Sequence, residues 1–382
     1  MHRATRSVLG FVFVAAPALA AAQGAAAMAA SPAPAALPSI DFSALVFGNY
    51  QYHTEPGAVV SNKFDLERAY MTFRLPVAER MLLRATLDLS PQQAGTGYVL
   101  RQKYAYLQYD FGGIGRGYKA VVRGGELQTQ VIEHVEGFWP RWMGVVPVER
   151  AGMSSSADVG VSGLVTLPSG RGEVYAAITN GAGYSKPESD RFKSFAARAT
   201  WTPLSSRRGI WRTLAVSAWG DLNAAASKFV AGGSGQTGPV GDGVGRDRYG
   251  IFAGVKDPRL TVGAEMAGRV DGVEEGANTK ASPRTVRDAR GALASAFVIA
   301  RPFALLDSAS HAPVAVVARV DRYAPDARVR GRAQFIDVGM IVDMNRARTT
   351  QIAFDYQAQT SDAVVTGIAT TKVYAVRFVT QF

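Results

Sequence analysis

The chain has 382 residues, of which 47% are hydrophobic and 19% are charged, and this balance excludes an intrinsically disordered protein. It contains no cysteine, which excludes disulfide frameworks, cysteine-ligated zinc and thiol nucleophiles. Lys and Arg (42) exceed Asp and Glu (31) by 11, an excess that ordinarily raises nucleic acid as a partner. The predicted destination of the chain argues against nucleic acid.

The N-terminus predicts export. Arg3 and Arg6 precede an unbroken run of apolar or small residues at 8–22, which is typical of a secretory signal peptide cleaved after Ala20 or Ala22. The 15-residue run is too short for a membrane anchor that stays attached. Cleavage removes two of the 42 cationic residues and no acid, so 40 against 31 leaves a net charge of +9. The Lys and Arg residues are scattered along the chain, so no nucleic-acid partner is predicted.

After the signal peptide (1–22), residues 23–40 are rich in Ala and Pro and carry no charge. Proline interrupts helices and the segment buries little, so it predicts a flexible leader to a β-barrel domain over 41–382. In that domain hydrophobic and polar residues alternate, as they do in a strand with one apolar face. Near the C-terminus, for example, Val376 and Arg377 fall on opposite faces.

Sixteen segments with this period are predicted, and most exceed the roughly five or six residues of an ordinary globular strand. Ten tilted residues at about 3.4 Å each are enough to cross the hydrocarbon of a bilayer. The segments lie near 41–53, 62–75, 79–90, 98–111, 117–128, 157–167, 171–181, 192–203, 210–223, 246–256, 258–268, 290–302, 312–324, 332–345, 348–360 and 370–382.

The connections between these segments alternate in length. Even-numbered segments mostly end in tight turns such as 76–78 and 168–170, whereas three odd-numbered segments end in long loops near 129–156, 224–245 and 269–289. A soluble sandwich has no reason to sort connections in this way, but an outer-membrane barrel does. The sequence therefore predicts an all-β fold, a transmembrane antiparallel β-barrel of about 16 strands with long extracellular loops and short periplasmic turns.

Aromatic residues support this orientation. Those at the short-turn ends of their segments, where a periplasmic aromatic girdle belongs, are Phe73, Phe111, Trp201, Trp211, Phe303 and Phe382. Because Phe382 also closes an alternating aromatic strand, the C-terminus resembles the assembly signal of outer-membrane proteins.

Nothing in the sequence points to a cofactor, a metal or catalysis. The glycines within 233–238 match a dinucleotide-binding spacing, but Pro239 and further glycines follow where that motif requires a helix. His53, His134 and His311 do not stand at metal-ligand spacing. No local arrangement of Ser, His and acid suggests a hydrolase.

The most informative connection follows the fifth segment, at about 129–155. It contains Glu133, His134, Glu136, Trp139, Pro140, Arg141, Trp142, Glu149 and Arg150. A fully exposed loop seldom needs two tryptophans, whereas a loop bent into the lumen would bury them against the barrel wall. The alternative is an external loop folded on itself, but the length and amphipathic content favour an inward-folded third loop.

Five short motifs together resemble the phosphate-selective porin O/P family of outer-membrane porins. They are Ala69–Phe73, Arg84–Asp88, Val122–Glu126, Val148–Arg150 and Asp158–Val161. The resemblance is best over the first half of the barrel, and it implies a sixteen-stranded trimeric channel with an arginine ladder and an inward third loop. The chain departs from the family in having only nine lysines, with no lysine cluster in its loops.

We therefore predict an outer-membrane porin without catalytic activity, a water-filled diffusion channel for small hydrophilic solutes with a modest anion preference. Its predicted partners are outer-membrane lipid, small anionic or neutral solutes and two further copies in a homotrimer. The predicted pore-lining residues are Arg68, Arg74, Arg84, Arg123, Arg141, Arg150, Arg198, Arg319, Arg377, Asp88, Glu133 and Glu136. Further inward acids are predicted at Glu265, Asp321, Asp337, Asp343 and Asp355.

The first and last strands of a closed barrel are neighbours, so Arg377, Arg68, Arg74 and Arg84 are predicted to form one basic wall opposite the acids. One alternative is an outer-membrane barrel enzyme or adhesin that acts through its long loops. Another is a secreted soluble β-sandwich.

Overall fold

The structure is a computed structural model that describes residues 39–58, 62–91, 97–184, 186–226, 243–277, 279–307, 312–329, 331–362 and 369–382. The predicted signal peptide, most of the predicted leader, the glycine-rich segment 233–238 and His311 lie outside the described residues.

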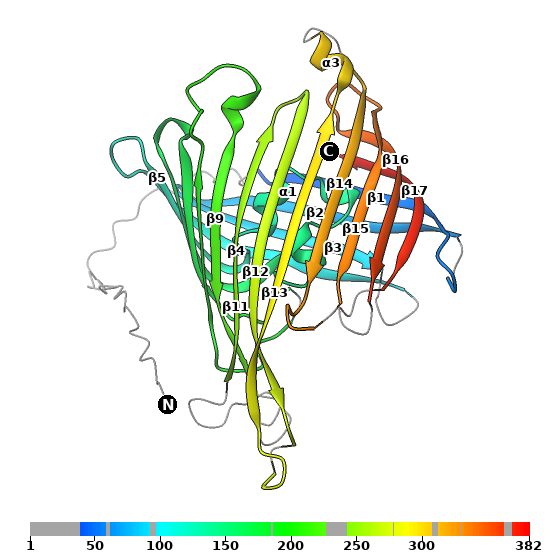
Figure 1. Ribbon diagram of the computed structural model, residues 1–382. Helices are drawn as coiled ribbons and strands as arrows, with labels where there is room; N and C mark the ends of the chain where they lie inside the picture. The colour runs from blue at the N-terminus through cyan, green and yellow to red at the C-terminus, as the bar shows by residue number, and fades with distance from the viewer. Residues whose placement is uncertain are drawn as a thin grey trace, which may run out of the picture. The chain divides into compact units, whose positions relative to one another are not determined.

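The described residues form seventeen strand segments in one antiparallel sheet that closes into a barrel (Figure 1). The segments are β1 (Asp41–His53), β2 (Asn62–Ala78), β3 (Met81–Pro91), β4 (Tyr98–Gly113), β5 (Lys119–Gln128), β6 (Ala157–Thr166), β7 (Gly172–Thr179), β8 (Ser194–Trp201), β9 (Ala215–Leu222), β10 (Ala224–Ala226), β11 (Gly243–Lys256), β12 (Leu260–Glu275), β13 (Thr285–Ala300), β14 (Val314–Ala324), β15 (Ala333–Asp343), β16 (Thr350–Ser361) and β17 (Thr371–Gln381). Both β9 and β10 pair with β11, so they are one strand interrupted at Asn223.

The closure of the barrel depends on β1, which pairs with β2 on one side and with β17 on the other. Each remaining strand pairs with its neighbours in the chain, so the barrel has sixteen antiparallel strands. Closure leaves no strand edge in need of a hydrogen-bonding partner, which is the condition for placing a sheet in hydrocarbon. The predicted fold class is confirmed.

The alternation in the sequence determines which side chains face the lumen. On β17, Arg377 is 4% exposed and faces inward, whereas Val376 beside it is 40% exposed and faces outward. On β15, Asp337 is 0% exposed and Val338 is 44% exposed. Successive strand residues point to opposite faces, so apolar side chains cover the outside, and charged ones such as Arg377 and Asp337 point to the interior.

The two rims of the barrel differ in their connections. At the short-turn rim, which is the upper end in Figure 1, the connections include η2 (Pro168–Gly170), η3 (Ile210–Thr213) and α3 (Pro302–Leu306). The opposite, long-loop rim carries the loop between β5 and β6, with α1 (Ile132–Glu136), η1 (Arg141–Met143) and α2 (Pro147–Arg150). Among the described residues, no helix combines the length and the apolar character needed to cross a membrane.

Two boundaries differ from the predictions. The strand predicted over 210–223 begins only at Ala215, because the residues before it form η3, in which Thr213 Oγ1 donates to the Ile210 carbonyl over 3.1 Å. The loop predicted near 224–245 is shorter, since β10 and the start of β11 occupy both of its ends.

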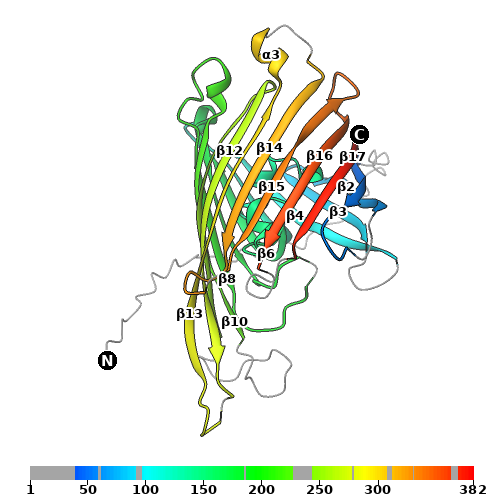
Figure 2. The same cartoon turned by 45° about the vertical axis from the view of Figure 1, so that its right-hand side comes forward.

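The prediction of a long loop near 269–289 is wrong. β12 and β13 continue as a paired hairpin to Glu275 and from Thr285, and the hairpin extends beyond its neighbours at the long-loop rim (Figure 2). Charged side chains on both faces of this hairpin hide the period of 2 in the sequence. They stabilise the pairing across the strands instead, as the 2.7 Å ion pair of Arg287 with Glu275 shows.

The six aromatic residues predicted at the short-turn rim all lie at that rim with exposed side chains. Their exposed fractions are 37% for Phe73, 45% for Phe111, 61% for Trp201, 52% for Trp211, 62% for Phe303 and 69% for Phe382. Phe42 joins them, since its ring centroid lies 5.1 Å from that of Phe73 and 6.3 Å from that of Phe382. Large exposed rings at one level are typical of an interfacial girdle.

Candidate functional site

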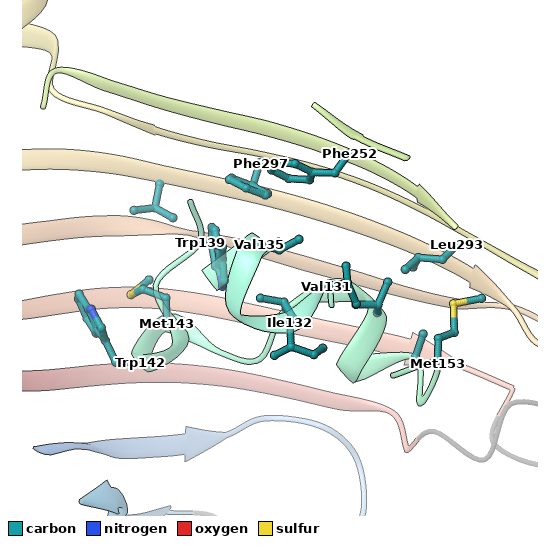
Figure 3. Packing of buried hydrophobic residues seen from close by; sticks show 14 of the residues in the cluster. Val131, Ile132, Val135, Trp139, Trp142, Met143, Met153, Phe252, Leu293 and Phe297 are labelled. Atoms are coloured by element: carbon teal, nitrogen blue, oxygen red, sulfur yellow. The ribbon is translucent and has the colours of Figure 1, made fainter. Parts of the chain in front are cut away.

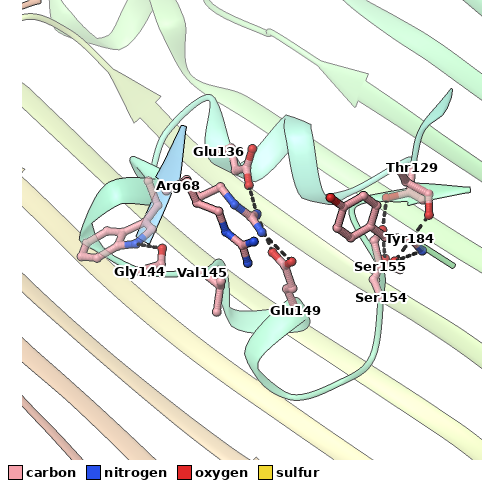
Figure 4. Close-up of polar contacts among 12 residues, drawn as sticks. Arg68, Thr129, Glu136, Gly144, Val145, Glu149, Ser154, Ser155 and Tyr184 are labelled. Atoms are coloured by element: carbon pink, nitrogen blue, oxygen red, sulfur yellow. Dashed lines mark hydrogen bonds and ion pairs between the residues drawn. The ribbon is translucent and has the colours of Figure 1, made fainter. Parts of the chain in front are cut away.

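The loop between β5 and β6, residues 129–156, is here called the inward segment. Its two ends meet at the long-loop rim, where Thr129 Oγ1 donates to the Ser155 carbonyl over 2.5 Å and the Thr129 amide lies 3.4 Å from the Ser156 carbonyl (Figure 4). The chain therefore leaves and re-enters the barrel wall at almost one point. Everything between those ends is free to fold against the barrel interior.

Apolar side chains fix the inward segment to the inner face of the wall (Figure 3). Ile132, Val135 and Trp139 are all 0% exposed. The Trp139 ring packs edge-on against Phe297 of β13, with 5.3 Å between ring centroids, and Leu293 of the same strand belongs to the same cluster. Burying aromatic and aliphatic side chains of this size supplies the driving force that holds the segment inside.

Polar contacts fix the position of the inward segment along the wall. Arg319 Nη1 on β14 donates to the Val145 carbonyl over 2.8 Å, and Gln357 Nε2 on β16 donates to the Met143 carbonyl over 3.0 Å. The Arg150 guanidinium lies 3.6 Å from the ring centroid of Phe335 on β15. The inward segment is therefore anchored to β13–β16, on the side of the barrel far from β5 and β6 in the sheet order.

Within the inward segment, Arg141 is held between two carboxylates. It donates to Glu136 and makes a two-pronged contact with Glu149 at 2.7 and 2.8 Å (Figure 4). Burial alone would raise the pKa of Glu149, but the charge and the hydrogen bonds of Arg141 outweigh it and lower that pKa. This cluster stabilises the fold of the inward segment. The side chains of Arg141 and Glu136 therefore bind each other within the segment.

His134 is also part of this packing. Its Nε2 lies 2.8 Å from Ser217 Oγ on β9, and its ring contacts that of Phe252 with 5.6 Å between centroids. Burial, with a smaller contribution from the charge of Arg198, lowers the pKa of His134 to about 3, so the ring is neutral at pH 7. Since the unfolded chain takes up this proton near pH 6.5, the barrel loses stability as the pH falls below that value.

Opposite the anchored side, the inward segment faces a wall of cationic and aromatic residues on β2–β5. The Arg84 guanidinium lies 4.9 Å from the ring centroid of Tyr104, and its Nη1 is 3.7 Å from Glu133 of the segment. Arg123 lies 5.3 Å from the ring of Tyr106. The side chain of Glu133 is 47% exposed, so this side of the segment is open to water.

The other predicted arginines on the β2 and β8 walls each have an acidic partner. Arg68 lies 3.3 Å from Asp88, and Arg74 lies 3.4 Å from Asp41. Arg198 on β8 is paired with Glu173 of β7.

The separate basic and acidic walls predicted from the sequence are interleaved in the structure. Arg319 is 2.6 Å from Asp321 on the same strand, and Arg377 is 2.8 Å from Asp355 on the neighbouring strand. Charges of both signs therefore alternate along one wall, and much of the field that they would produce across the lumen cancels at short range.

The predicted pore-lining residues fall into two groups. Arg319 and Arg377 lie beneath the inward segment, with side chains that are 0% and 5% exposed, and Arg150 belongs to the segment itself, at 21% exposed. Arg68 and Arg74 are more open, at 27% and 36%. The first group is covered by the segment, so solute would meet mainly the wall of β2–β5 and the open face of the segment.

Residues that the sequence analysis missed line a polar cavity of about 790 Å³ at the long-loop rim. They include Arg101 on β4, Lys186 in the β7–β8 connection, and Arg246 and Arg248 on β11. The alternation Arg246-Asp247-Arg248 was a signal for Arg246 and Arg248. In β4, by contrast, a bulge at Lys103 shifts the alternation and obscures the direction in which Arg101 faces.

Glu265 on β12 is an unpaired carboxyl group buried behind the inward segment. It is 1% exposed, and neither carboxylate oxygen has a hydrogen-bond partner among the described residues. Glu265→Met keeps the length of the side chain and removes the unsatisfied group, so it is expected to raise the free energy of unfolding by about 1–3 kcal/mol. Urea titration of the barrel refolded in detergent measures this change.

The matched control for this prediction is Glu133→Met, at an acid whose side chain is 47% exposed. It is expected to change the free energy of unfolding by less than about 1 kcal/mol, since an exposed pair contributes little. A barrel that becomes less stable in Glu265→Met than in the control would show that the Glu265 carboxyl group stabilises the fold.

Within the described part of the chain, no group of three His, Asp or Glu residues is placed to hold a metal ion. The contact of His134 with Ser217 has the spacing of a base and a nucleophile, but Ser217 is only 1% exposed. A substrate would have to reach the Ser217 hydroxyl, and this burial prevents it.

The barrel is similar to solved outer-membrane proteins. The anion-selective porin from Comamonas acidovorans has a TM-score of 0.59 at 12% identity, with 90% of this chain and 99% of that chain covered. The trimer form of OmpT, an outer membrane protein of Vibrio cholerae, has a TM-score of 0.58 at 10% identity, covering 91% and 100%. The outer membrane channel DcaP of Acinetobacter baumannii has a TM-score of 0.57 at 11% identity, covering 91% and 97%.

Comparison with protein-family models finds no match, and comparison with curated proteins finds none either. Sequence identities near 10% establish a shared fold and nothing finer. The chain has the fold of the outer-membrane β-barrels, a closed antiparallel barrel of sixteen strands with a long segment packed inside it.

Proposed function

We propose that the protein is an outer-membrane porin, a passive channel for small hydrophilic solutes with a modest anion preference. The observation that carries this proposal is the barrel wall: it is apolar outside, and inside, on β2–β5, its arginines, acids and tyrosines face the water-exposed side of the inward segment, where we place the passage for solute. A polar lining keeps such a passage wet, and charged side chains in it set the preference among ions.

The predicted signal peptide supports export, and the exposed aromatic residues at the short-turn rim support an orientation with that rim in the periplasm and the long loops outside the cell. The three solved structures named above, which include an anion-selective porin and an outer membrane channel, agree with this proposal. The five motifs that resemble the phosphate-selective porin O/P family make phosphate-like anions the solutes to test first.

A homotrimer is part of the proposal. One feature of the outer surface supports it: Gln102 and Glu126 lie on the outward face of β4 and β5, joined by a 3.0 Å hydrogen bond from Gln102 Nε2. A carboxylate facing hydrocarbon is unfavourable, whereas an interface between protomers could cover it. OmpT of Vibrio cholerae is described in a trimer form, which agrees with this assembly. Light scattering of the detergent-solubilised protein measures the number of copies.

The anion preference is tested by reversal potentials across a potassium chloride gradient. Arg68, Arg74 and Arg84 lie on the wall of β2 and β3 that faces the inward segment, with side chains 27%, 36% and 15% exposed, so neutralising all three to Gln is expected to reduce the chloride-to-potassium permeability ratio toward or below one. The matched control neutralises three exposed arginines in the β8–β9 connection, Arg207, Arg208 and Arg212, to Gln and is expected to leave the ratio unchanged. A channel that prefers cations in its wild-type form would overturn the anion preference.

A further inference from the structure

The 790 Å³ cavity at the long-loop rim is built from strand ends that converge on one space. β6, β7, β8, β9 and β11 each contribute the end that is nearest the long loops, and the neck of the inward segment closes the cavity at Ser154–Ser156. Most of the surface that lines it is polar. Solute passing from the long-loop rim toward the wall of Arg84 would cross this cavity first.

The acids in the cavity already have donors from the protein. Asp158 accepts the Val159 amide at 2.8 Å, the Gly181 amide at 2.7 Å and the Thr179 hydroxyl at 3.1 Å. Asp221 accepts the hydroxyl of Ser194 at 2.5 Å.

The third acid, Glu149, is bound by both arms of Arg141, as described above. Both oxygens of Asp158 and Glu149 and one oxygen of Asp221 therefore accept hydrogen bonds, and the charge of these carboxylates is partly compensated.

In the part of the chain that the structure describes, most of the cations of the cavity, unlike its acids, lack a partner from the protein. Arg248 is paired with Asp271 at 2.6 Å. In contrast, Arg101, Lys186 and Arg246 have no hydrogen bond or ion pair from their side chains within the described residues. They approach the cavity from three separate parts of the wall, namely β4, the β7–β8 connection and β11.

We propose that this cavity is a binding site for small oxyanions, with Arg101, Lys186 and Arg246 as the residues that bind the anion. A guanidinium group offers a planar pair of donors that matches the oxygens of a carboxylate or phosphate, and an ammonium group adds an unoriented charge. No ion pair joins these three cations to the acids of the cavity within the described residues, although the charge of Arg246 acts on Asp221 at longer range. The inference rests on the proposed channel function, and it places anion recognition ahead of the arginines on β2 and β3.

The direct test is equilibrium binding to the folded, full-length protein in detergent, by calorimetric titration with inorganic phosphate and, separately, with succinate. Arg101→Gln, Lys186→Gln and Arg246→Gln combined are expected to weaken binding at least about tenfold, and each single variant to weaken it less. The matched control is Arg208→Gln, an exposed arginine in the connection at the opposite rim, with unchanged binding expected. Heat-modifiable migration in gels verifies that each variant is folded.

Single-channel conductance of the same variants separates this proposal from the channel function. A wild type that conducts ions but binds neither phosphate nor succinate would overturn the site and leave the channel intact. A wild type that binds phosphate through these three residues but forms no conducting channel would retain the site and overturn the channel. Equal affinity in the triple variant and the wild type would also overturn the site, and if the triple variant does not fold, the single variants decide.

Discussion

Replacing residues 132–150 by a short Gly-Ser linker is expected to raise single-channel conductance severalfold while the barrel still assembles. The inward segment extends into the lumen from its anchor on β13–β16 to its contact with Arg84, so its removal widens the water-filled cross-section. Its ends already meet through Thr129 and Ser155, so a short linker can join them without strain on β5 or β6. Planar-bilayer recordings in symmetric potassium chloride measure the change.

A second deletion serves as the control. Replacing residues 204–208, in the connection between β8 and β9 at the short-turn rim, with the same linker is expected to leave conductance unchanged. Equal conductance in the wild type and in a correctly folded 132–150 variant would contradict the role of the inward segment as the constriction. Deleting the segment also exposes Phe252 and Phe297 to the lumen, so a small loss of stability is expected in the long variant alone.

Val338→Arg and Val376→Arg are expected to lower the free energy of unfolding of the barrel by about 2–4 kcal/mol each. Both valines face outward, at 44% and 40% exposed, in the middle of β15 and β17. At this depth in a bilayer an arginine must leave water or deform the lipid. Denaturant titration of the protein folded into lipid vesicles measures the loss.

The control for this pair is Leu306→Arg, at an outer position of α3 that is 87% exposed and beyond the strands. It is expected to change the free energy of unfolding by less than about 1 kcal/mol, because a charge near the interface remains hydrated. Equal stability of Val338→Arg, Val376→Arg and the wild type would mean that this surface does not face hydrocarbon.

The sequence by itself determined the number of strands, their order and their inside and outside faces. Period 2 is a local property of the backbone, so the alternation of Val376 with Arg377 assigns each side chain to a face before any partner strand is known. The amphipathic content of 129–155 likewise predicted a segment inside the barrel with its tryptophans buried against the wall. In the structure Trp139 of this segment is 0% exposed.

Strand ends were harder to predict, because they depend on pairing across the sheet. The hairpin of β12 and β13 carries charges on both faces, and only its cross-strand ion pairs, such as Arg287 with Glu275, show that those charges belong to strands. Alternation disappears where both faces are wet, so the sequence pattern there resembles a loop.

Only the tertiary structure decided which charges are neighbours and which are free. A sequence gives the face of Arg319 and Arg377, but their partners Asp321 and Asp355 depend on side-chain geometry and on the stagger of adjacent strands. The cavity lined by Arg246 depends on five strand ends and one folded-in segment that are far apart in the chain. Electrostatic interactions act through distances in space, and spacing along the chain fixes those distances only within one strand.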